Sequence, residues 1–113
     1  MTGSERRRGA RHLVQILLPT HTRTGAAVAP EQFARVRVEL TERFGGVTAY
    51  TRSPATGLWK REEDDAIERD QVIMVEVVVE DLDRAWWAAY REQLEDRFEQ
   101  EEVHTRALAM DLM

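Results

Sequence analysis

Hydrophobic and polar positions divide the chain into segments with two different periodicities. Residues 12–18 are almost wholly apolar and stop at Pro19, which is typical of a β-strand. Residues 71–80 place β-branched side chains on one face and remain mostly apolar on the other, which favours a central strand. Residues 46–52 and 101–110 carry a weaker β pattern. These four segments are the strands that we expect.

Two further segments repeat apolar residues at helical spacing. After Pro30, which suits the first turn of a helix, apolar residues follow at Phe33, Val36, Leu40 and Phe44. The same spacing returns at Trp87, Tyr90, Leu94 and Phe98. Gly45 lies where a left-handed residue ends a helix, and Asp81 or Asp83 precedes the second segment as an N-terminal cap. We therefore expect two amphipathic helices.

The order of these elements is strand, helix, strand, strand, helix, strand. With right-handed crossovers this order predicts a ferredoxin-like βαββαβ fold of the α+β class. It consists of a four-stranded antiparallel sheet, in the order 4-1-3-2, with both helices on one face. The chain has 113 residues, which suffices for one domain with its own core. We expect this domain to span residues 12–113, after a disordered basic tail over residues 1–11.

Two helices cover only one face of such a sheet, and the other face is predicted to be apolar. Strand 71–80 adds Val72, Met74, Glu76 and Val78 to this open face. Strand 12–18 adds one of two sets, either Leu13, Gln15 and Leu17 or His12, Val14, Ile16 and Leu18. An apolar patch on a small protein usually marks an interface. We therefore expect a homodimer that uses this face.

Composition narrows the classes of function. The chain has no cysteine, which excludes disulfides, zinc–thiolate sites and thiol catalysis. It has 16 basic and 21 acidic residues, and arginines concentrate in the tail, so the acidic body argues against nucleic-acid binding. No apolar run approaches the ~20 residues of a membrane span, and no targeting signal is complete, so we expect a cytoplasmic protein. We predict neither cofactor nor metal, and leave open whether the protein is an enzyme.

Six residues are candidates for a ligand site. Glu76 is an acid in the middle of the most apolar strand and needs a partner, for which Gln15, Arg52, Arg106 or a second copy are the candidates. Trp59 lies between a Pro/Gly turn and an acidic loop, outside any helical stripe, which suits a lid or an interface anchor. A pocket near the open face would be lined by Gln15, Tyr50, Arg52, Trp59, Glu76 and His104.

One stretch of the chain resembles a known group. Residues 44–52, FGGVTAYTR, with Pro54-Ala55 and the segment 57–59, resemble the motif FGG-[VL]-TAYTR-x-PA-x-G-x-W of short uncharacterised bacterial proteins. Residues 81–87, DLDRAWW, and 98–102, FEQEE, resemble the same group. More distantly, the chain is similar to a bacterial domain-of-unknown-function family with the same order of elements, often with a lipoprotein signal. The lipoprotein cysteine is absent here, so the envelope location does not carry over. The resemblance implies the fold, but neither an activity nor site residues.

Two functions fit these patterns. The open face and the lack of a catalytic arrangement favour a homodimeric binding, regulatory or scaffolding module. The alternative is a small-molecule-binding protein or enzyme of the dimeric α+β-barrel type, with a pocket near the open face, and it rests on fold analogy. An unknown small molecule or protein partner fits either function, whereas nucleic acid and membrane fit neither.

Overall fold

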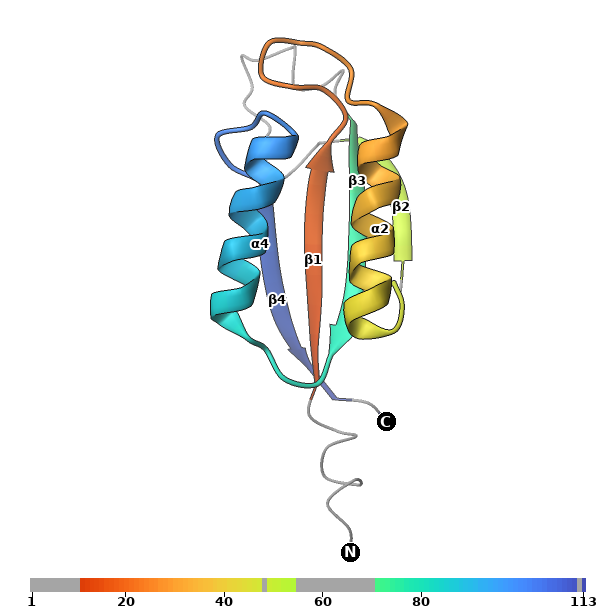
Figure 1. Cartoon of the computed structure of the whole chain (residues 1–113). Helices are drawn as coiled ribbons and strands as arrows, with labels where there is room; N and C mark the ends of the chain where they lie inside the picture. Colours follow the sequence, from red (N-terminus) through yellow and green to blue (C-terminus); the bar gives the residue numbers. More distant parts are fainter. Residues whose placement is uncertain (1–10, 48, 55–70, 112) are drawn as a thin grey trace, which may run out of the picture.

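The structure is a computed structural model that describes residues 11–47, 49–54, 71–111 and 113, with the backbone alone for 49–54 and Gln71. Its elements are β1 (Arg11–Pro19), α2 (Pro30–Phe44), β2 (Ala49–Pro54), β3 (Gln71–Val79), α4 (Arg84–Arg97) and β4 (His104–Met110), as Figure 1 shows. Residues 1–10 of the predicted basic tail, Trp59 and the acidic loop around it lie outside the described residues. Arg11 already belongs to β1.

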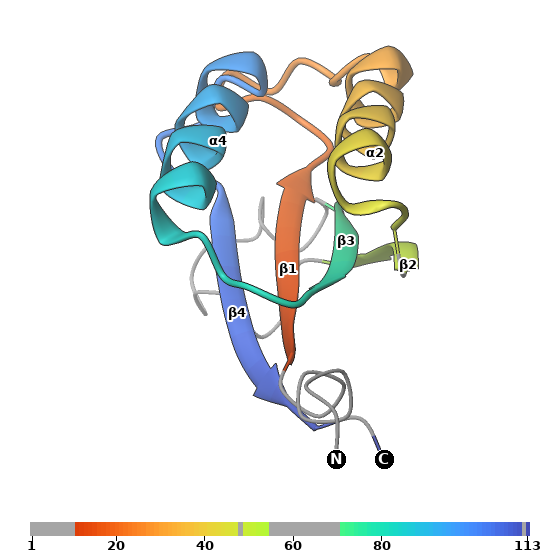
Figure 2. The same ribbon diagram turned by 60° about the horizontal axis from the view of Figure 1, so that its bottom comes forward.

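The strand β1 lies at the centre of the sheet. It pairs antiparallel with β3 on one side and with β4 on the other, and β2 pairs with the far edge of β3. The backbone pairing thus follows the expected order, β2-β3-β1-β4. Both helices lie on one face of the sheet (Figure 2). Arg11, at the start of β1, is the register partner of Met110 at the end of β4.

The predicted fold class needs a correction. A ferredoxin-like domain requires four strands packed beneath two helices. Here β2 is a six-residue edge strand that is described by its backbone pairing alone, so the sheet whose side-chain packing is described has three strands, β3, β1 and β4. With the two helices these strands give the order β-α-β-α-β. The fold is therefore an α+β arrangement, and the prediction of a ferredoxin-like fold was wrong.

Two predicted strands begin three residues later than expected. β2 begins at Ala49 rather than at residue 46, because Gly45 first ends α2 in the left-handed region, at φ 86°. β4 begins at His104 rather than at residue 101. Just before it, the backbone N–H of Val103 donates to Glu95 Oε2 of α4 at 3.0 Å instead of to a neighbouring strand. The end of each helix thus includes residues that the β pattern predicts to lie in the following strand.

Local signals set the helix ends as predicted. Pro30 lies in the first turn of α2, and the N–H of Gly45 donates to Thr41 O at 2.8 Å, which confirms the left-handed cap. Of the two predicted caps for α4, Asp83 is the one used, and its Oδ1 accepts the N–H of Trp86 at 3.1 Å.

The main core lies between the sheet and the two helices. Both predicted helix stripes point into it, although Phe44 is only half-buried and stacks on Trp87 with ring centroids 5.3 Å apart. The strands contribute Val14, Ile16, Leu18, Ile73, Val75, Val77 and Val79. This decides between the two sets of β1, because the set that includes Val14 faces the helices and the set that includes Gln15 faces away.

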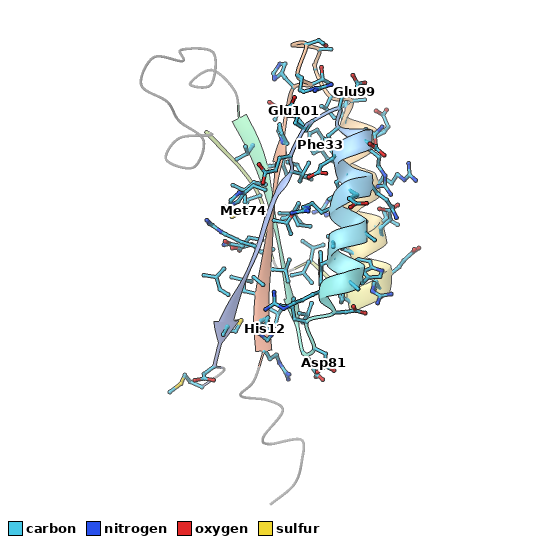
Figure 3. The ribbon with its side chains drawn as sticks, turned by 90° about the vertical axis from the view of Figure 1, so that its left-hand side faces the viewer. His12, Phe33, Met74, Asp81, Glu99 and Glu101 are labelled. Atoms are coloured by element: carbon cyan, nitrogen blue, oxygen red, sulfur yellow. The ribbon has the colours of Figure 1, made fainter. Side chains whose placement is uncertain are left out.

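The open face is less exposed than the sequence predicts. Figure 3 shows Met74 on the side of the sheet away from the helices. On that side Leu17 and Val72, only 0% and 2% exposed, form a second small cluster with Met74. Only the part of the face towards the start of β1 therefore remains open to a partner.

Candidate functional site

A polar row crosses the middle of the open face. Gln15 of β1 is the register partner of both Glu76 in β3 and Arg106 in β4. Directly opposite residues point to the same face, so the three side chains lie side by side. Gln15 Nε2 donates to Glu76 Oε2 at 2.5 Å, and Arg106 Nε donates to Gln15 Oε1 at 2.6 Å. The amide of Gln15 therefore bridges a carboxylate and a guanidinium.

Gln15 is therefore the hydrogen-bond partner of Glu76, and Arg106 in turn donates to Gln15. All three residues are half-buried. Among the described residues, Arg106 donates only through Nε and Glu76 accepts only at Oε2. The terminal guanidinium nitrogens and the second carboxylate oxygen are left for other partners. The row thus presents a positive end on β4 and a negative end on β3.

Apolar residues border the polar row on both sides. Towards the start of β1, the next row across the sheet consists of Leu108, Leu13 and Val78. Leu108 is 46% exposed, which is unusual for a leucine in a sheet. Towards the other end, the next row consists of His104, Leu17 and Met74. Apart from His104, the described part of the open face is therefore a polar strip within an apolar surface.

The structure brings together part of the six-residue set. Gln15 and Glu76 are in contact, and His104 occupies the neighbouring row. Tyr50 and Arg52 are register partners of residues in β3 that face the helices, Val75 and Ile73, whereas Glu76 pairs with Ala49.

The acidic loop and the histidines are the remaining groups whose side chains could bind a metal ion. Glu62 to Asp65 lies outside the described residues, as does Trp59. His21 Nδ1 shares a hydrogen bond of 2.9 Å with Thr20 Oγ1, and the backbone O of His21 accepts from Gln100 Nε2. Within the described ranges, no three His, Cys, Asp or Glu side chains gather in a way that would hold a metal ion. No helix there is long and apolar enough to cross a membrane.

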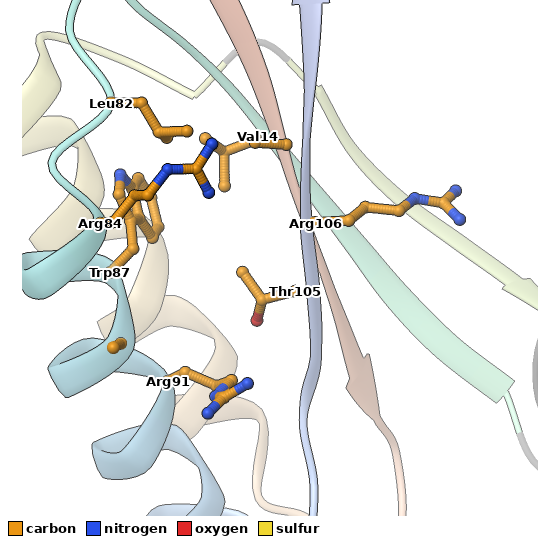
Figure 4. A pocket seen from close by; sticks show the side chains of 9 residues that line it. Val14, Leu82, Arg84, Trp87, Arg91, Thr105 and Arg106 are labelled. Carbon is orange, nitrogen blue, oxygen red and sulfur yellow. The ribbon is translucent and has the colours of Figure 1, made fainter.

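Sequence reasoning missed a cavity of about 210 Å³ between α4 and β4. Figure 4 shows Arg84, Trp87 and Arg91 on the helix side, with Thr105 facing them from β4. The side chain of Arg106 points to the opposite side of β4, towards the open face (Figure 4). The signal for this cavity was the spacing of Arg84, Ala88 and Arg91, which places three residues on one helix face outside the apolar stripe.

A polar network joins the two helices on the far side of the core. Glu39 of α2 accepts hydrogen bonds from Tyr90 Oη and Arg97 Nη1 of α4, each at 2.8 Å. Burial alone would raise the pKa of Glu39, but the hydrogen bonds from Arg97 and Tyr90 outweigh it and hold that pKa below its ordinary value. Burial, and then the hydrogen bond to Glu39, raise the pKa of the Tyr90 hydroxyl far above its ordinary range. All groups are mutually satisfied, so this network stabilises the helix pair.

Comparison with protein-family models, curated proteins and solved structures gives no match to this chain. The resemblance to the bacterial proteins with the FGG motif therefore stays a prediction from the sequence.

Proposed function

We propose that the protein is a homodimeric binding module, regulatory or scaffolding in role, whose two copies pack open face against open face. The observation that carries this proposal is the order of charges across the sheet. The row Arg106, Gln15, Glu76 runs from positive through neutral to negative, and its neighbour, the row Leu108, Leu13, Val78, is apolar. Such a surface is complementary to a rotated copy of itself.

The symmetry of the contact follows from this order. A two-fold axis parallel to β1, midway between two stacked sheets, exchanges the positions of β3 and β4 and keeps each row at its own level. Arg106 then lies opposite Glu76 of the second copy, and Leu108 lies opposite Val78 of the second copy. An axis across the strands would instead oppose Arg106 to its own copy, which like-charge repulsion disfavours. We therefore expect strands that run parallel across the interface.

The contact is expected to be reversible. Leu17 and Val72 are already buried within one copy, so they add little new area to a contact between copies. Stable interfaces bury about 800 Å² on each partner, and an apolar row beside a polar one offers less than that. Dimerisation in the micromolar range is the expected outcome.

A charge exchange tests the proposal. Arg106→Glu and Glu76→Arg each oppose like charges across the two-fold axis, so each single variant should be monomeric at concentrations where the parent protein dimerises. The double variant restores opposite charges, with the row reversed, and should dimerise again. The measurement is sedimentation equilibrium of the full chain from micromolar to submillimolar concentration.

Matched controls separate the interface from general charge effects. Arg23→Glu and Glu92→Arg make the same changes at exposed positions away from the open face and should leave the dimer intact. Circular dichroism verifies that every variant is folded. A monomeric parent protein, or a double variant that stays monomeric while folded, would contradict the proposed symmetry.

The alternative function, a small-molecule-binding protein or enzyme with a pocket near the open face, remains a prediction from the sequence. Gln15, Glu76 and His104 do not line the α4–β4 cavity, which lies on the helix side of the sheet. A ligand site near the open face would therefore have to form elsewhere, with Trp59 among its candidates. Cytoplasmic location likewise remains a prediction from the sequence.

A further inference from the structure

We propose that the cavity between α4 and β4 binds a small aromatic carboxylate. The proposal goes beyond the dimer and is independent of it, because the cavity lies on the helix side of the sheet and the dimer contact on the other side.

The cavity exists because small side chains face each other across it. On α4 the position towards β4 between the two arginines is Ala88, and β4 offers Thr105 and Ala107 in return. The bulky residues of α4, Trp87, Tyr90 and Leu94, belong to the core stripe. The helix and the strand are therefore held apart by the core without a large side chain between them, and about 210 Å³ stays open.

The polar groups at the cavity are donors. Of the described residues that line it, Arg84 and Arg91 place charged side chains there, and none is Asp or Glu. Arg84 is exposed and makes no ion pair with any described residue. Arg91 Nε lies 3.7 Å from Glu95 Oε2, too far for a good hydrogen bond, and that oxygen already accepts the N–H of Val103. A cavity with two arginines on an otherwise acidic protein favours an anion.

One donor on the cavity wall is buried and unmet at the end where Arg91 lies. Arg91 Nε has no hydrogen-bond partner among the described residues. The indole Nε1 of Trp87, a residue only 6% exposed, is unmet there as well, but this nitrogen lies towards Arg84 and not towards Arg91 (Figure 4). Buried N–H groups are almost always satisfied, so Arg91 Nε calls for an acceptor that the described residues do not supply. A carboxylate provides two acceptor oxygens and matches the planar guanidinium of arginine.

The shape of the site requires more than a simple anion. Arg84 and Arg91 are seven residues apart, which is about 10 Å along a helix. The wall between and opposite them is apolar, with Val14, Leu82, Trp87 and Ala107. At one end Arg91 lies near the hydroxyl side of Thr105, and at the other Arg84 lies near Val14 and Leu82 (Figure 4). We assign the carboxylate to the Arg91 end, and an aromatic ring to the wall formed by Trp87, with Arg84 at the mouth.

Titration of the full chain with benzoate tests the assignment, with the indole N–H signals followed by NMR. Trp87→Phe identifies which of the three indole signals belongs to Trp87. Benzoate should shift that signal saturably. Arg91→Gln should weaken the binding at least tenfold, and Arg84→Gln by less. The same change at an exposed arginine remote from the cavity, Arg23→Gln, should have no effect.

Filling the cavity gives a second, independent readout. Ala88→Leu places a larger side chain on the cavity wall and should abolish the benzoate response. Ala89→Leu makes the same change at the next, equally exposed helix position, which does not line the cavity, and should leave it unchanged.

Two further probes separate the parts of the ligand. Benzyl alcohol, which lacks the charge, and inorganic phosphate, which lacks the ring, should each bind at least tenfold more weakly than benzoate. Equal binding of phosphate would overturn the aromatic assignment, and equal binding of benzyl alcohol would overturn the anionic one. A Trp87 signal that benzoate does not shift, or shifts equally in the Arg91→Gln and Ala88→Leu variants, would overturn the proposal as a whole.

Discussion

At the scale of single residues, the partly buried polar side chains of this protein form hydrogen bonds with other side chains. Glu39 receives Arg97 Nη1 and Nη2 at 2.8 and 3.0 Å, together with the Tyr90 hydroxyl. Gln15 bridges Arg106 and Glu76 on the opposite side of the sheet. Four buried polar atoms of the described residues lack a partner, on His12, Gln32, Trp87 and Arg91, and the last two residues line the same cavity.

The Tyr90–Glu39 contact predicts a late tyrosine titration. Tyr50→Phe leaves Tyr90 as the only tyrosine of the chain. At about pH 11, where an ordinary tyrosine is largely ionised, this variant should show almost no tyrosinate absorbance until it is unfolded by urea. Adding Glu39→Gln removes the neighbouring negative charge and should shift the titration towards lower pH. Ionisation of folded Tyr50→Phe near pH 10 would contradict the contact.

The same contact determines how stability changes with pH. The pKa of Tyr90 is raised on folding, so its contribution is complete below about pH 10 and is lost as the pH rises through the folded value. The pKa of Glu39 is lowered on folding, so its contribution is present above its ordinary value of 4.5 and is lost as the pH falls through the folded value. Urea unfolding should therefore show a smaller acid-induced loss of stability for Glu39→Gln than for the parent protein.

At the scale of elements, local sequence patterns predict that each helix and strand exists, but they do not predict the residue at which each strand begins. The stripes of both helices and the left-handed Gly45 follow from spacing and from side-chain chemistry, whereas the structure alone decides that Asp83 and not Asp81 caps α4. The starts of β2 and β4 do not, because they depend on how the preceding helix ends. Glu99, with a positive φ of 52°, and the bond from Val103 to Glu95 delay β4, and neither has a sequence signal of its own.

The cap of α4 is a test at this scale. Asp83→Ala removes the acceptor for the N–H of Trp86 and should lower the free energy of unfolding by about 1 kcal/mol. Asp83→Asn retains an acceptor and should recover most of that loss. Asp81→Ala, two residues earlier at an exposed position, is the matched control and should have little effect. Equal losses for both alanine variants in urea titrations would argue against a cap at Asp83.

At the scale of the whole molecule, the sequence predicts which residues form the core better than it predicts where a site lies. The apolar face of β3 that meets the helices follows from alternation, whereas both faces of β1 are largely apolar and the structure decides between them. The six site candidates were chosen for their chemistry. Tyr50 and Arg52 share no register row with Glu76, because they pair with Val75 and Ile73 while Ala49 pairs with Glu76. The α4–β4 cavity depends on the small size of Ala88, Thr105 and Ala107, and its one sequence signal, the spacing of Arg84, Ala88 and Arg91, does not show that a cavity lies beside them.

The pairing of Arg11 with Met110 has a consequence for the connectivity of the chain. These two residues are neighbours at the ends of adjacent antiparallel strands, so a short Gly/Ser linker suffices to join them. A circular permutant that joins Met110 to Arg11 and opens at the exposed Thr24–Gly25 turn should retain the circular dichroism spectrum and cooperative unfolding of the parent protein. A permutant that fails to fold would show that β1 must precede β4 in the chain for the sheet to assemble. A folded permutant would establish that the contacts between register partners specify the sheet, whatever the order of the strands along the chain.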